Sequence, residues 1–276
     1  MSEWMVTLEK SWLWLGGSLL LATLWTNLAW FFRHPRPGPI GEFIAHLTTL
    51  RLAPLTLQGL RLLYYVGFPF AALLWGHDVV IGRLIGLQQL NLPVAGDNLA
   101  GVDVAANWLD WAQDLGWAAA LGIAACGLLA LGWYAYRRAL IASGSTDGEG
   151  SKIAGANISG WVLLREAAYH EFHWAFYRSV PIFAAGMYWG TWIGLLLVVL
   201  EAMLNPAWRK RLADPYKAPA QLLRGALAVV SSALFLLTQN LWVAIVLHWG
   251  ISWALNVVAR MLPLLTGHIA DQASIR

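Results

Sequence analysis

Long apolar runs separated by short polar segments make up most of this chain. Several runs approach the roughly 20 residues that a helix needs to cross a hydrocarbon core of about 30 Å. These runs predict helical spans at 12–32, 54–76, 116–136, 161–178, 180–203, 223–239 and 241–262. The pattern therefore predicts an all-α fold, a polytopic transmembrane bundle of about seven helices.

Charged residues between the runs predict the orientation of the bundle. Arginine and lysine cluster after the first, third, fifth and last runs, as at Arg51, Arg137 and Lys210. The segment 77–115 instead carries five aspartates and one basic residue, Arg83. Because cytoplasmic loops are enriched in Lys and Arg, this alternation predicts an N-terminus outside and a C-terminus in the cytoplasm.

Loop composition divides the chain into two halves. Residues 1–142 form a three-span N-terminal half whose acidic exterior loop is predicted to contain a short interfacial helix around Ala105 to Leu115. Residues 143–156 are rich in Gly, Ser, Thr, Asp and Glu, which is typical of a flexible linker, here on the cytoplasmic side. Residues 157–276 form a four-span half.

Composition supports a lipid environment. The chain is 59% hydrophobic and 12% charged, whereas about a quarter of the residues of a soluble domain are charged. Its net charge of +3 comes from short separate clusters, which argues against a nucleic-acid partner and for the bilayer itself. The single cysteine, Cys126, excludes an intramolecular disulfide and a cysteine metal cage.

The fourth run carries ionisable residues on two sides of its predicted helix. At about 100° per residue, one polar stripe contains Glu166, His170, His173 and Tyr177. Glu171 and Arg178 form a second stripe. Because an ionisable group at membrane depth costs at least a few kcal/mol unless it is paired or hydrated, this helix is predicted to face the bundle interior. The alternative is a solvated helix end, with Glu171 paired to Arg178 and Glu166 to His170.

The last run supplies a possible partner for these acids. His248 is followed one turn later by Ser252, and Gln239 and Asn240 precede the run. A lone histidine in an apolar helix can also be a packing residue. Carboxylates and imidazoles together fit either a divalent metal, with His170, His173 and His248 as candidate ligands, or a general-base site without a cofactor.

Two segments, EFHWAFYR in the fourth run and LWVAIVLHWGIS in the last, resemble motifs of the CPBP family. These are the CAAX-protease and bacteriocin-processing membrane endopeptidases, also called Abi proteins, with EExxxR, FxxxH and HxxxN motifs. Glu171 and Arg178 resemble the glutamate and arginine of the first motif. His248 and Ser252 match the third motif, with serine in place of asparagine. The second motif aligns best with Phe235 and Gln239, so glutamine stands in place of histidine, and the resemblance covers residues 161–260.

This resemblance implies a glutamic or metal-dependent intramembrane endopeptidase acting on a membrane-anchored or leader-bearing peptide. Glu171 or Glu166 would activate a water, Arg178 would orient the glutamate, and His248 with His173 would stabilise the oxyanion. The alternative is a catalytically inactive homologue that serves as an accessory or assembly subunit of a larger membrane protein complex. A transporter ranks behind both, because only the fourth run is strongly polar.

Overall fold

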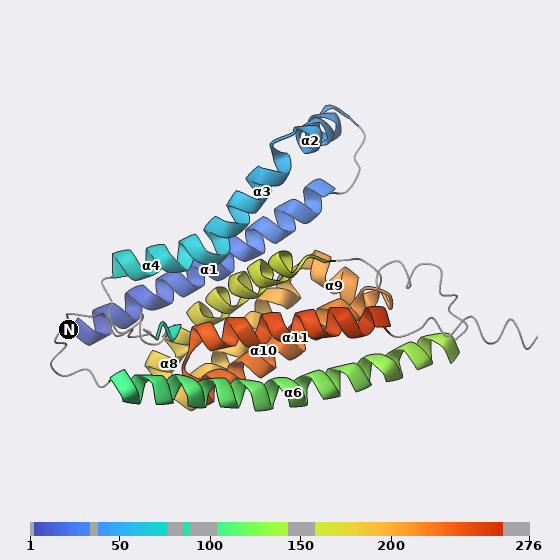
Figure 1. The fold of residues 1–276 in the computed structure, drawn as a ribbon. Helices are drawn as coiled ribbons and strands as arrows, with labels where there is room; N and C mark the ends of the chain where they lie inside the picture. The colour runs from blue at the N-terminus through green and yellow to red at the C-terminus, as the bar shows by residue number, and fades with distance from the viewer. Residues whose placement is uncertain (1–2, 34–37, 77–84, 89–103, 143–157, 262–276) are drawn as a thin grey trace, which may run out of the picture.

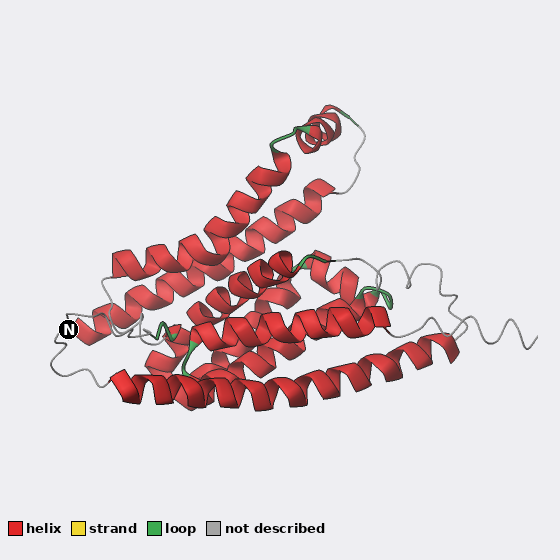
Figure 2. Cartoon of the chain, viewed as in Figure 1, coloured by secondary structure: helices red, strands yellow, loops and turns green. Residues whose placement is uncertain are grey.

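The computed structural model describes residues 3–33, 38–76, 85–88, 104–142 and 158–261, and its regular elements there are all helices (Figures 1 and 2). They are α1 (Glu3–Arg33), α2 (Pro39–Thr49), α3 (Ala53–Leu62), the π-helix η1 (Leu63–Gly67), α4 (Phe68–Gly76), α6 (Val104–Ala142), α8 (Gly160–Leu204), α9 (Pro206–Ala213), α10 (Ala218–Thr238) and α11 (Leu241–Met261). The prediction of an all-α fold is confirmed.

Five of the described helices are long and apolar enough to cross a membrane. Their candidate spans are Ser11–Phe32, Trp108–Ala139, Gly160–Leu204, Ala218–Thr238 and Leu241–Val258. Large apolar side chains stay exposed on these helices, including Leu13, Ile123 and Leu128, each more than 70% exposed. Such surfaces are unfavourable in water and suit lipid, so an integral membrane protein is the consistent interpretation.

The chain of α8 reverses direction at Gly186, which separates one helical arm, 160–185, from a second, 187–204. Gly186 has φ 78° and ψ 170°, a region that is open essentially to glycine alone. The sequence pattern placed a break between the spans at Ser179. The helix instead continues past that point, because Arg178 lies among buried partners and does not reach water at a helix end.

The two arms of α8 lie against each other at glycines. A Cβ atom on Gly190 would lie 2.2 Å from the Cα of Ile182, and one on Gly194 would lie 2.7 Å from the Cα of Arg178. Small residues of this kind allow membrane helices to approach backbone to backbone. The close approach brings polar residues of the second arm beside those of the first.

Helices α3, η1 and α4 follow one another without a break, and α4 lies alongside α1 (Figure 1). Pro54 occupies the first turn of α3, where a missing N–H leaves no hydrogen bond unmade. Trp14 of α1 meets Phe68 of α4 edge to face, with ring centroids 5.4 Å apart. The first arm of α8 packs against this pair through Phe176 and Tyr177.

Contacts between distant segments define the two ends of the bundle. At the end that carries α9, called here the basic end, Tyr136 donates a hydrogen bond to the Pro215 carbonyl and Lys210 lies 5.4 Å from the Trp30 ring centroid. At the opposite end, Asn240 donates to Asp114 at 2.9 Å. At the basic end, α9 thus meets the end of α1, and the end of α6 meets the turn that follows α9.

One expected element in the first half differs from the structure. Residues Ala105 to Leu115 are not a separate interfacial helix but the beginning of α6, which continues through Gly116 without a break. A single glycine weakens a helix by only about 1 kcal/mol, so it does not end one here. The proposed linker 143–156 and most of the acidic loop lie outside the described residues.

Candidate functional site

The two polar stripes of the first α8 arm face different neighbours. Glu171 and Arg178 point toward α10 and α11, where both are buried, with exposed fractions of 0% and 1%. His173, on the other stripe, faces the second α8 arm and η1. The arm therefore lies between two separate polar networks.

Glu171 is held through both carboxylate oxygens. His248 Nδ1 lies 2.9 Å from Oε1, and the Ser231 hydroxyl donates to Oε2 at 2.5 Å. Arg178 Nη1 donates to the Ser231 oxygen at 3.1 Å, while its Nη2 lies 4.0 Å from Glu171 Oε2. Arg178 is thus linked to Glu171 mainly by hydrogen bonds through Ser231. The direct ion pair expected between Arg178 and Glu171 is present only at 4.0 Å.

The hydrogen bonds of Ser231 bear on the tautomer of His248. Ser231 accepts from Arg178, so its own hydrogen is free to point at Glu171. If Glu171 is an ionised carboxylate, which can only accept, the shared hydrogen lies on His248 Nδ1. The other ring nitrogen, Nε2, then carries a lone pair and can act as a base.

A second network surrounds His173. Its Nε2 lies 2.7 Å from Glu201 Oε2, and the Tyr64 hydroxyl donates to Glu201 Oε1 at 3.2 Å. The Tyr64 and Tyr65 rings both lie within 5.2 Å of the His173 ring, centroid to centroid. Both tyrosines belong to the π-helix η1. Single π-helical turns are frequently found at functional sites.

Glu166 pairs with arginines and not with His170. Arg61 of α3 donates to its two oxygens at 3.1 and 2.5 Å, and Arg165 donates to Oε1 at 3.1 Å. The Arg61 contact has the bidentate geometry that strengthens arginine–carboxylate pairs. Glu166 therefore links α3 to the start of α8.

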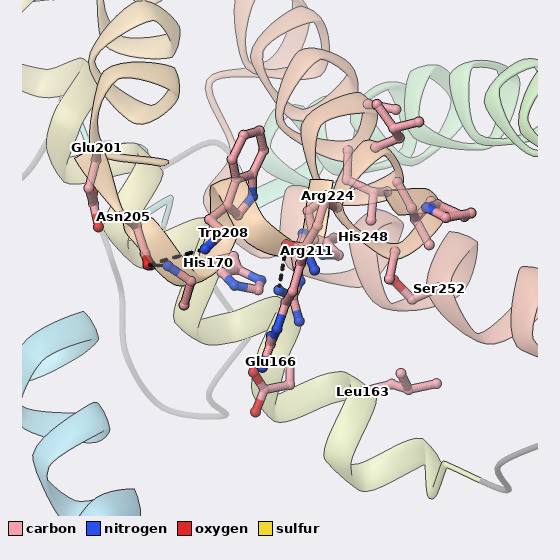
Figure 3. Close-up of a pocket in the computed structure, with 18 of the residues that line it drawn as sticks. Leu163, Glu166, His170, Glu201, Asn205, Trp208, Arg211, Arg224, His248 and Ser252 are labelled. Atoms are coloured by element: carbon pink, nitrogen blue, oxygen red, sulfur yellow. Dashed lines mark hydrogen bonds between the residues drawn. The ribbon is translucent and has the colours of Figure 1, made fainter. Parts of the chain in front are cut away.

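These networks border one large cavity of about 1590 Å³. Its walls come from α1, α3, η1, α4, α6, α8, α9, α10 and α11. Glu166, His170, Glu201 and His248 all line it, and Figure 3 shows them around the same hollow. The His170 ring is nearly parallel to the His248 ring, with centroids 5.7 Å apart. Glu171 and His173 are not among the lining residues; they lie behind His248 and Glu201.

The four supporting residues expected from sequence have different positions. Ser252 lines the cavity. Tyr177 accepts a hydrogen bond from Ser18 of α1 at 3.5 Å. Gln239 and Asn240 lie at the α10–α11 turn, where Gln239 adopts φ 50° and the Asn240 side chain accepts from the first backbone N–H groups of α11. Gln239 therefore ends α10, and Asn240 caps the start of α11.

The histidines do not form a metal site. Within the described part of the chain, no group of three or more His, Cys, Asp or Glu side chains could hold a metal ion. His248 is bonded to Glu171, His173 to Glu201, and His170 stacks on Trp174. The three candidate ligands thus have separate partners, and their geometry does not fit a shared metal.

Sequence reasoning missed several residues of the site. Arg61, Glu201 and Arg224 each stand alone in an apolar run, and an isolated ionisable residue at membrane depth is a functional candidate by default. That signal was present in the sequence. Ser231 had no such signal, since a serine in an apolar helix is common, and only the packing of α10 against α8 identifies it.

The chain was also compared with known proteins. It matches no protein-family model, no curated protein sequence and no solved structure. Any functional conclusion therefore depends on the geometry of the cavity and its two networks.

Proposed function

We propose that this chain is a CPBP-like intramembrane endopeptidase that cleaves a membrane-anchored or leader-bearing peptide, with His248 as its general base. The observation that supports this proposal is the 2.9 Å contact between His248 and Glu171 at the wall of a large cavity. A buried carboxylate behind an imidazole fixes its tautomer and orientation, as in serine hydrolases.

The proton path follows from this arrangement. His248 Nε2 takes a proton from a water whose oxygen bonds to the peptide carbonyl carbon. The same proton passes to the amine nitrogen when the C–N bond breaks. Glu171 stabilises the imidazolium in between and is a positioning residue, because its side chain is fully buried. This differs from the role of water activator that the family resemblance implies for Glu171.

A seven-span topology accompanies this proposal. The two arms of α8 count as two spans in place of one. The continuous segment α3–η1–α4, which contains a π-helical turn, counts as one more span. The positive-inside rule then places the basic end and the C-terminus in the cytoplasm and the N-terminus outside. Single cysteines at Asp97 and Asp147, in a Cys126→Ala background, test this with an impermeant maleimide. Labelling of the Asp147 position from outside intact cells would refute the orientation.

Activity is tested with purified protein in lipid nanodiscs and a library of membrane-anchored peptides. His248→Ala should lower turnover by about 10²–10⁴-fold, the usual contribution of a general base. Glu171→Gln should lower it too, because the tautomer of His248 is no longer fixed. His46→Ala and Glu42→Gln on exposed positions of α2 are matched controls. Cleavage that survives His248→Ala would exclude the proposed base.

One observation favours the accessory-subunit alternative. Both carboxylate oxygens of Glu171 already have hydrogen-bond partners, Ser231 and His248. These contacts connect α8 to α10 and α11, which is also what a purely structural network would do. In that case no peptide is cleaved and the chain co-purifies stably with another membrane complex. The same cleavage and purification experiments therefore separate the two functions.

A further inference from the structure

The cavity carries more positive than negative charge. Four arginines and two glutamates line it: Arg61, Arg137, Arg211, Arg224, Glu166 and Glu201. Both glutamates are engaged, Glu166 with Arg61 and Glu201 with His173. The ion pairs of the described residues include neither Arg211 nor Arg224, and Glu166 acts on Arg224 only at longer range.

Arg211 and Arg224 approach the same region from different elements. Arg211 lies on α9 and Arg224 on α10, and Figure 3 shows both side chains in the hollow near His170 and His248. They are close enough to repel each other electrostatically. Arg224 donates to the uncharged amide oxygen of Gln221 at 3.3 Å.

Two like charges close together at the wall of a cavity attract an anion. Both arginines line the cavity and both are exposed, so their guanidinium groups are accessible to a ligand inside it. Guanidinium groups bind phosphate oxygens in a bidentate geometry. Two of them on separate helices match a phosphate, which has more oxygens and more charge than a carboxylate.

The remaining wall suits a hydrocarbon chain. Beside the arginines, the cavity is lined by apolar residues of α1 and α6, including Trp25, Leu21 and Leu128. Its volume of about 1590 Å³ exceeds the roughly 300–1,000 Å³ of most small-molecule pockets. An amphiphile with a charged head and a long tail would fill both parts.

We propose that the cavity binds an anionic lipid with a terminal phosphate, held by Arg211 and Arg224, with its acyl chains along α1 and α6. The lipid site shares the cavity with the proposed peptidase but does not require hydrolysis. Loss of lipid binding with cleavage intact, or the reverse, would therefore separate the two proposals.

Native mass spectrometry of the full-length protein in detergent tests this site. Phosphatidic acid should bind more tightly than diacylglycerol with the same acyl chains or than inorganic phosphate. Arg211→Gln and Arg224→Gln should each weaken phosphatidic acid binding about ten-fold or more, the value of a charged hydrogen bond. Arg209→Gln, on an exposed position of the same α9 helix, is the matched control and should have no such effect.

Several results would overturn the proposal. Equal loss in Arg209→Gln and Arg224→Gln would mean that only surface charge attracts the lipid. Equal binding of diacylglycerol would remove the role of the phosphate, and equal binding of inorganic phosphate would remove the role of the tail. Tighter binding of a peptide with a free C-terminal carboxylate would replace the lipid as occupant. Arg224→Lys, which keeps the charge, should retain more binding than Arg224→Gln and controls for folding.

Discussion

Removing the charge of Glu171 should destabilise the protein more than removing the charges of Glu171 and Arg178 together. Both side chains are almost completely buried, and Arg178 Nε and Nη2 have no hydrogen-bond partner within the described structure. Glu171→Gln would leave this guanidinium without a compensating charge, which costs about 3–5 kcal/mol in a buried pair. In the double variant with Arg178→Met, neither charge remains and the methionine can still pack on Phe235, which the guanidinium now covers at 4.5 Å.

The free energy of unfolding can be measured by titration with a denaturing detergent, followed by the fluorescence of the 18 tryptophans. The double variant should recover at least about 2 kcal/mol of the loss in Glu171→Gln, since replacing a buried pair by apolar groups is often neutral. Glu42→Gln on exposed α2 is the control for a surface carboxylate. Additive losses from the two substitutions would refute the idea that these charges compensate each other.

Two further substitutions test the packing that positions the site. Gly190→Ala should destabilise the protein by about 1–3 kcal/mol, because the new Cβ would collide with the Ile182 backbone; the same detergent titration measures this, and Gly127→Ala, with open space around it, should not. Asn240→Ala should cost about 2 kcal/mol or more, since it removes the α11 cap and the hydrogen bond to a buried Asp114. Unchanged unfolding curves for either variant would contradict the corresponding contact.

The apolar runs predicted helices at most of the places where the structure has them. This worked because the length of a span and the cost of exposing backbone groups to lipid are properties of the local sequence. The prediction failed at Ser179, where the boundary depends on whether Arg178 finds buried partners. It also failed at Ala105 to Leu115, which continues directly into α6.

The sequence by itself determined that residues such as Glu171, His173 and His248 need polar partners, since the cost of burying each one is local. It did not determine which partner each would take. The pairs of Glu171 with His248 and of His173 with Glu201 join residues 77 and 28 positions apart. They depend on the reversal at Gly186 and on how α10 and α11 pack, because the angles and distances between helices arise from side chains that are remote in sequence. Only the tertiary structure therefore decided the site.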